Sequence, residues 1–234
     1  MVADAVVYHP TVAHYLKFIA TTVGRDKLLR TLQYWSRFYA WYLYRTNNPQ
    51  ANVAAYDAVK KNMGMARKLL RLGKFVEHLK AAAVAADSKG SDAVIKYLTV
   101  GRQLGYAGYM ALDNATVPDL VGFRKSANIK KIGEQASRAW ATGLLFSVVA
   151  GVYTLAQLRK RSAAVDEKEA ESVVEKKKIQ REGNAAKIQL ITDICDLAVP
   201  LTALGYVNLD DGIVGLTGTL SSLIGVWSVW KKTA

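Results

Sequence analysis

Residues 63–83 read MGMARKLLRLGKFVEHLKAAA, and this stretch decides how the chain is interpreted. Its apolar positions repeat at intervals of four, three, four, three and four residues, at Met65, Leu69, Leu72, Val76, Leu79 and Ala83. At about 100° per residue they fall on one face of a helix, which Phe75 widens on one side. Basic residues lie on roughly the opposite face, at Arg67, Arg71, Lys74 and His78. Such a helix can lie in an anionic membrane surface, or cover a partner or its own protein core.

The composition favours a negatively charged partner for the N-terminal part of the chain. The 234 residues are enough for one or two domains, and 51% of them are hydrophobic. The net charge is +13, and residues 1–138 hold 21 Lys and Arg against 9 Asp and Glu. Residues 139–234 hold 11 against 10. We therefore expect the basic part to meet an anionic phospholipid membrane.

The cysteine content and the N-terminus exclude two common kinds of protein. A single cysteine, Cys195, rules out an internal disulfide framework and a cysteine-based zinc site, and its apolar surroundings predict a buried packing role. The first ten residues show neither a basic n-region nor an apolar h-region. A secretory signal peptide is therefore not expected.

Residues 1–138 are predicted to form a basic, cytosol-facing helical region, the part of the chain expected to meet the membrane. An aromatic-rich helix is expected over 11–45, with a stop at residues 47–49 (Asn-Asn-Pro) and an interruption at Gly24. Further helices are expected over 52–86, which includes the amphipathic stretch, and over 92–112.

Residues 139–158 are predicted to be a transmembrane helix. These 20 residues carry no charge and lie between Arg138 and the basic residues 159–161. At 1.5 Å per residue they just span a hydrocarbon core of about 30 Å. Residues 159–187 follow as a charged helical loop, whose mixed signs predict a solvated helix.

Residues 188–234 are predicted to form C-terminal apolar helices. Asp193 and Asp196 interrupt residues 188–209, which we therefore interpret as a packed or interfacial helix. Residues 212–230 are uncharged and form a second span candidate. Its small residues, which would allow close helix packing and self-association, are Gly215, Gly218, Ser221, Ser222 and Gly225. The predicted class is an all-α membrane protein with amphipathic N-terminal helices and one or two transmembrane helices.

No motif for catalysis, metal binding or cofactor binding is found in the sequence. The three histidines are isolated, so neither a metal site nor an enzyme is expected. Residues 101–108 are rich in glycine but follow no strand, which favours helix packing over a nucleotide loop. Interleaved aromatic and basic residues also occur in proteins that bind single-stranded nucleic acid. The membrane-like C-terminal part argues against a nucleic-acid partner here.

Three blocks of the sequence resemble the peroxin-11 family of peroxisomal membrane proteins. Residues 23–38 (VGRDKLLRTLQYWSRF) resemble its N-terminal signature, and residues 67–75 (RKLLRLGKF) its second block. Residues 212–225 (GIVGLTGTLSSLIG), followed by tryptophan and lysine residues, resemble its C-terminal block. The overall pattern is similar to that of the filamentous-fungal members.

This resemblance implies a protein of the peroxisomal membrane that is multi-pass and has both termini facing the cytosol. It implies homo-oligomers, tubulation of the membrane before fission, and thereby peroxisome proliferation. It also implies that the chain recruits or stimulates the dynamin-like fission GTPase with its membrane adaptor. Delivery by the import receptor for peroxisomal membrane proteins is implied as well.

The membrane-inserting helix of the family corresponds by position to residues 63–83. The side chains expected to insert are Met65, Leu69, Leu72, Phe75, Val76 and Leu79. Those expected to bind lipid headgroups are Arg67, Lys68, Arg71 and Lys74. Two alternatives remain at this point. One is a pore for small metabolites lined by Thr217, Thr219, Ser221 and Ser222, and the other is an amphipathic helix packed into a protein bundle or a dimer.

Overall fold

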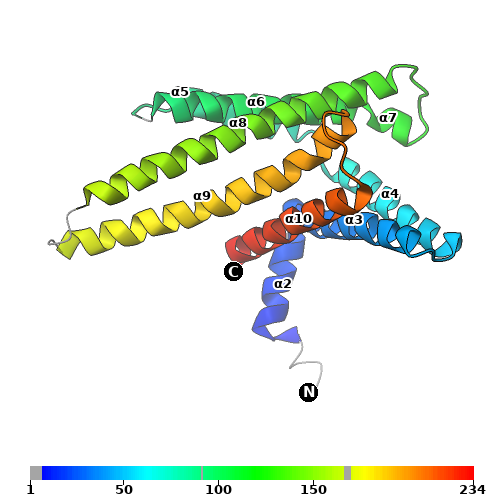
Figure 1. The fold of residues 1–234 in the computed structure, drawn as a ribbon, viewed down its shortest axis with the longest axis horizontal. Coiled ribbons are helices and arrows are strands. Elements are labelled where there is room, and N and C mark those ends of the chain that lie inside the picture. The colour runs from blue at the N-terminus through cyan, green and yellow to red at the C-terminus, as the bar shows by residue number, and fades with distance from the viewer. Residues whose placement is uncertain (1–6, 91, 166–169) are drawn as a thin grey trace. The chain divides into compact units, whose positions relative to one another are not determined.

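A computed structural model describes residues 7–90, 92–165 and 170–234, and within these ranges the chain forms helices and no strand (Figure 1). The all-α prediction is confirmed. Residues 1–6, on which the signal-peptide prediction partly depends, and 166–169 of the charged segment lie outside the described residues. The chain divides into two compact units, one of Met1–Leu72 with Asn208–Ala234 and one of Gly73–Val207.

The first unit contains α2 (Pro10–Ala20), α3 (Thr22–Arg45), α4 (Gln50–Leu70) and α10 (Asp211–Thr233). Helix α3 is central, because it packs against both α4 and α10. The break in the first predicted helix falls at Thr21 rather than at Gly24. The Thr21 hydroxyl accepts a hydrogen bond from the Gly24 backbone N–H at 2.9 Å, so it caps the start of α3.

Glycines allow α10 to approach α3 closely. A methyl group at Gly215 would lie only 2.6 Å from the backbone nitrogen of Phe38, and one at Gly218 would overlap the ring of Tyr34. Close backbone approach of this kind is what a small-residue stripe permits. The first unit is therefore held by an α3–α10 contact that bulkier residues would separate.

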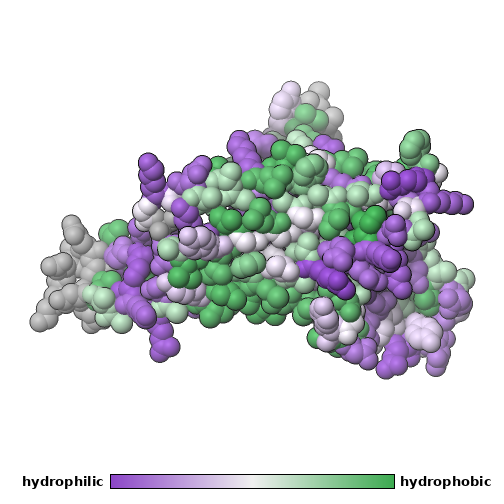
Figure 2. All heavy atoms as spheres, turned by 90° about the horizontal axis from the view of Figure 1, so that it is seen from above, coloured by the Kyte–Doolittle hydropathy of each residue, from purple (hydrophilic) through white to green (hydrophobic). Residues whose placement is uncertain are grey.

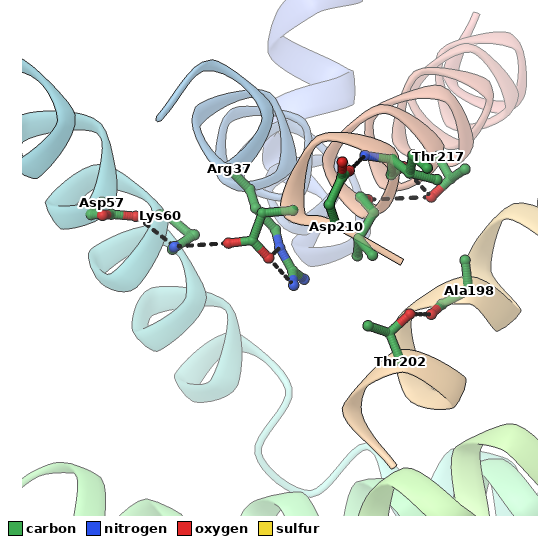
Figure 3. Close-up of polar contacts among 10 residues, drawn as sticks. Arg37, Asp57, Lys60, Ala198, Thr202, Asp210 and Thr217 are labelled. Carbon is green, nitrogen blue, oxygen red and sulfur yellow. Dashed lines mark hydrogen bonds and ion pairs between the residues drawn. The ribbon is translucent and has the colours of Figure 1, made fainter. Parts of the chain in front are cut away.

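A polar network joins α3, α4 and α10 near the start of α10 (Figure 3). Arg37 of α3 contacts Asp211 at 2.6 Å, and Lys60 of α4 lies 3.9 Å from the same carboxylate and also pairs with Asp57. Asp210 caps α10 by accepting from the Ile213 backbone N–H at 2.9 Å. Since the Asp211 side chain is half exposed, these ion pairs stabilise the unit only modestly.

The second unit contains α5 (Phe75–Asp87), α6 (Ala93–Ala115), α7 (Val117–Leu120), α8 (Ile129–Ala164) and α9 (Ala170–Ala203). Helix α5 packs on α6, α6 on α8, and α8 on α9. A methyl group at Gly105 of α6 would lie 2.6 Å from the Cα atom of Gly143 of α8. The glycine-rich residues 101–108 thus serve helix packing, as the sequence indicated.

The predicted spans fall within longer helices. Residues 139–158 lie inside α8 and residues 212–230 inside α10, and both helices are long and apolar enough to cross a membrane. The predicted segments 159–187 and 188–209 are not separate elements: residues 159–164 continue α8, and residues 170–203 form one helix, α9, with Pro200 inside it. The predicted helix over 52–86 is wrong as a single element, because α4 ends at Leu70 and α5 begins at Phe75.

Candidate membrane-binding surface

A turn divides the amphipathic stretch into two helices. Residues 71–74 connect α4 to α5, and Gly73 adopts a φ of 77°, in the left-handed region that favours glycine. The expectation of one continuous amphipathic helix over residues 63–83 is therefore wrong. The boundary between the two units falls within this turn, after Leu72, so the first half of the stripe belongs to the first unit and the second half to the second unit.

The apolar stripe is exposed in both halves. Leu69 and Leu72 in the first unit, and Val76 and Leu79 in the second, are between 42% and 56% exposed. Met65 and Phe75 are half-buried. Neither unit buries these four side chains against its own helices. The structure therefore does not pack the whole stripe into a helical bundle within the chain.

The two arginines of the opposite face point into the protein. Arg67 is 7% exposed; its Nε donates to Oδ1 of Asp26 on α3 at 3.0 Å, and a terminal nitrogen donates to Gln33 at 2.6 Å. Arg71 is also buried and donates from Nε to the carbonyl of Arg67 at 3.2 Å. Both were predicted to bind headgroups. Here Arg67 holds α4 on α3 through its buried ion pair with Asp26, and Arg71 bonds to the carbonyl of Arg67.

The electrostatics of this site follow from its burial. Burial raises the pKa of Asp26, but the guanidinium groups of Arg67 and Arg71 more than offset this and hold that pKa below its usual range. Burial lowers the pKa of Arg67, and the Asp26 carboxylate opposes that shift. Asp26 and Arg67 therefore form a buried ion pair at neutral pH.

Lysines supply the cations near the exposed stripe. Lys68 and Lys74, both predicted, are half-buried. Lys61 and Lys80 are exposed as well, but they lie outside residues 67–74 and were not among the predicted headgroup-binding residues. Lys61 precedes Met65 by four residues and so continues the stripe on the same face of α4. This spacing could have identified it from the sequence.

The small residues of α10 pack within the chain rather than between copies. In α10, Gly215, Gly218 and Gly225 lie against Phe38, Tyr34 and Lys27 of α3 respectively. Ser221 and Ser222 are fully buried. In this structure these small residues pack on α3, so this face of α10 is occupied and is not open for self-association.

The hydroxyl groups suggested as a pore lining bond to their own helix. Thr217 donates to the carbonyl of Ile213 at 3.0 Å and Thr219 to that of Gly215 at 2.7 Å, while Ser221 and Ser222 donate to that of Gly218. Three of the four, Thr219, Ser221 and Ser222, are also buried. This arrangement satisfies the hydroxyls inside the protein and gives no support to the pore.

The polar side chains gather into no metal site in the part of the chain that the structure describes. His14 contacts the backbone oxygen of Trp230 at 2.9 Å, and His78 contacts Gln103 at 2.8 Å. These histidines therefore link helices within each unit. The arrangement leaves the exposed apolar stripe and the long apolar helices as the features that suggest a function.

These features together define a helical membrane protein, in which apolar side chains face outward and several charged groups face inward. The sequence comparison gives the family: residues 12–230 match the model described as Peroxisomal biogenesis factor 11 (PEX11). Because the match covers nearly the whole chain, the protein belongs to this family. It is a peroxisomal membrane protein involved in peroxisome proliferation.

Similar proteins occur in yeasts and in animals. The chain is 30% identical to Peroxisomal membrane protein PMP27 of Saccharomyces cerevisiae over 245 residues, covering all of both chains. It is 27% identical to Peroxisomal membrane protein PMP30B of Candida boidinii, over all of this chain and 99% of the other. Identity to human Peroxisomal membrane protein 11A is 24%, over 92% and 95% of the two chains. No solved structure matches.

Proposed function

We propose that this protein curves and elongates the peroxisomal membrane before fission by inserting the apolar stripe into one leaflet. The observation that supports this is the exposure of Leu69, Leu72, Val76 and Leu79, while Arg67 on the other side is anchored to Asp26. Met65 and Phe75 would widen the inserted surface. Apolar side chains that each unit leaves uncovered are typical of a membrane interaction site.

The energies are sufficient for reversible insertion. Full burial of a large apolar side chain contributes roughly 1.5–3 kcal/mol, so four side chains that are about half exposed would contribute on the order of 3–6 kcal/mol. Each lysine near anionic headgroups adds about 1 kcal/mol, and Lys61, Lys68, Lys74 and Lys80 are the candidates. Apolar volume inserted into one leaflet expands that leaflet relative to the other. The expanded leaflet becomes the convex side of the bent membrane.

The finer parts of the function rest on family membership and on the basic N-terminal part. We propose homo-oligomers, which would concentrate the inserted stripes into a tubule. We also propose recruitment or stimulation of a dynamin-like fission GTPase through its membrane adaptor, and delivery by the import receptor for peroxisomal membrane proteins. Both termini would face the cytosol, where the basic residues of 1–138 can reach the anionic outer leaflet.

A matched pair of substitutions in α5 tests the insertion. The full-length protein is added to liposomes that contain anionic lipid, and tubules are counted by electron microscopy. Leu79→Glu should abolish tubulation, because it places a charge in the apolar stripe. Val84→Glu should retain it, because Val84 is even more exposed but lies about 100° around the helix from the stripe. Unchanged helicity by circular dichroism shows that both variants are folded, and tubulation by Leu79→Glu at the parental level would refute the proposal.

A further inference from the structure

Helices α8 and α9 of the second unit enclose polar side chains between them. The hydroxyl of Ser147 on α8 donates to one carboxylate oxygen of Asp193 on α9, and Gln189 donates to the other at 2.9 Å. Ser147, Asp193 and Asp196 are all buried, and Asp193 is 2% exposed. The interface between these helices thus holds a buried polar cluster around Asp193, beside the apolar contact of Gly151 with Leu190.

The outward faces of the same two helices are apolar. The large side chains that they leave about half exposed are Leu145, Val149 and Val152 on α8, and Ile191 and Ile194 on α9. In the view from above in Figure 2, which labels no helix, hydrophobic residues gather across the middle of the visible surface and hydrophilic residues lie toward its left and right. A water-soluble helix pair has the opposite arrangement, with apolar residues inside and polar residues outside. A helix pair with apolar outer faces and a hydrogen-bonded polar cluster between its helices is suited to a lipid environment.

The register of the pair places α9 at the depth of the predicted span. Ser147, near the middle of residues 139–158, bonds to Asp193, and Gly151 packs against Leu190. Along these contacts the residue number rises in α8 while it falls in α9, so the two helices are antiparallel. In this register residues 188–201 lie beside residues 139–153. The ion pairs between the two helices lie outside these paired segments, where Arg161 of α8 pairs with Glu175 and Glu182 of α9. If α8 crosses the membrane, its hydrogen-bonded neighbour must enter the acyl core too.

We propose that α9 crosses the membrane as the antiparallel partner of α8, with lipid acyl chains covering Ile191 and Ile194. Helix α10, which packs on α3, then does not cross, so that the two termini stay on the same side of the membrane. The sequence suggested a packed or interfacial helix for residues 188–209 because of the two aspartates. In the structure these aspartates are turned away from the outer surface, and Asp193 is hydrogen-bonded by Ser147 and Gln189. An ionisable group that faces another helix and is bonded there is compatible with the bilayer interior. The proposal is independent of the stripe at residues 65–79.

Depth-dependent quenching tests the position of α9 directly. The full-length protein is reconstituted into phosphatidylcholine vesicles after Cys195→Ser removes its only cysteine. A fluorophore is attached to Ile194→Cys or, as a control on the charged part of the same helix, to Lys178→Cys. Lipids brominated deep in the acyl chain should quench the label at 194 at least threefold more than the label at 178. Equal quenching at both positions, or no quenching at 194, would overturn the proposal and indicate α9 in water or covered by protein.

A charge placed on the outer face supplies a second, independent measurement. In peroxisomal membranes, Ile194→Lys should reduce the fraction resistant to alkaline carbonate extraction several-fold, because it exposes an ammonium group to acyl chains. Val174→Lys is the control: Val174 is also exposed on α9, but it lies near the charged end. Both side chains are exposed, so we expect both variants to fold, which circular dichroism checks. Resistance of Ile194→Lys at the parental level would overturn the proposal.

Discussion

Replacing Asp26 by asparagine should weaken the attachment of α4 to α3. Asp26 and Arg67 lie 3.0 Å apart and are both less than 10% exposed. The asparagine keeps the shape of the side chain but leaves the guanidinium of Arg67 buried without a counter-charge. Breaking a buried ion pair in this way costs about 3–5 kcal/mol. The bond from Arg67 to Gln33 at 2.6 Å persists, so we expect the lower end, about 3 kcal/mol.

Tryptophan fluorescence during urea denaturation in mild detergent can measure this loss. Four of the five tryptophans, at positions 35, 41, 227 and 230, belong to the first unit, so the signal reports mainly its unfolding. Asp57→Asn is the matched control, because Asp57 pairs with Lys60 at the surface and its side chain is 47% exposed. An exposed pair of this kind contributes at most about 1 kcal/mol. The double variant Asp26→Leu with Arg67→Met should recover most of the stability, since neither charge then remains buried.

Two results would refute this reasoning: a cost for Asp26→Asn no greater than that for Asp57→Asn, or no recovery in the double variant. Acid provides a further check with a definite sign. Because the arginines lower the pKa of Asp26 in the folded protein, its contribution is complete above the unfolded value of about 4. It is lost as the pH falls through the lower folded value. Asp26→Asn should lack this part of the acid destabilisation.

Three glycine substitutions, one of them a control, test the packing and the turn. Gly215→Ala should destabilise the first unit by about 1–3 kcal/mol in the same denaturation assay, because its methyl group would meet the backbone of Phe38; a stable variant would contradict the α3–α10 contact. Gly73→Ala should lower the free energy of unfolding by about 1 kcal/mol, because Gly73 has a positive φ. Gly183 lies inside α9 with no neighbouring atoms around its Cβ position, so Gly183→Ala should raise the free energy of unfolding by roughly 0.5–1 kcal/mol. Stabilisation of similar size by both alanines, measured by thermal unfolding followed with circular dichroism, would show that the turn at 71–74 is not formed.

Local patterns in the sequence were enough for the all-helical class and for the apolar parts of several helices, but not for all helix boundaries. The spacing of the stripe at residues 65–79 predicted which side chains share a face, and the uncharged runs predicted the apolar parts of α8 and α10. These signals are local, because helical periodicity and charge content are read within a few turns. The break at residues 71–74 was missed. A glycine inside an apolar pattern can either continue a helix at a small cost or end it, and the pattern alone does not decide between them.

The partner of each face depended on contacts between residues far apart in the chain. Arg67 and Arg71 look like free surface cations until Asp26, about 40 residues away, is placed beside Arg67. Gly215 looks available to a second copy until Phe38 of α3 covers it. Asp193 looks too costly for a membrane until Ser147 bonds to it. The sequence by itself determined that the chain is helical, basic in its N-terminal part and apolar enough to enter a membrane. Only the tertiary structure decided which charges are compensated inside the protein and which apolar side chains remain uncovered, because burial and pairing arise between helices and not within them.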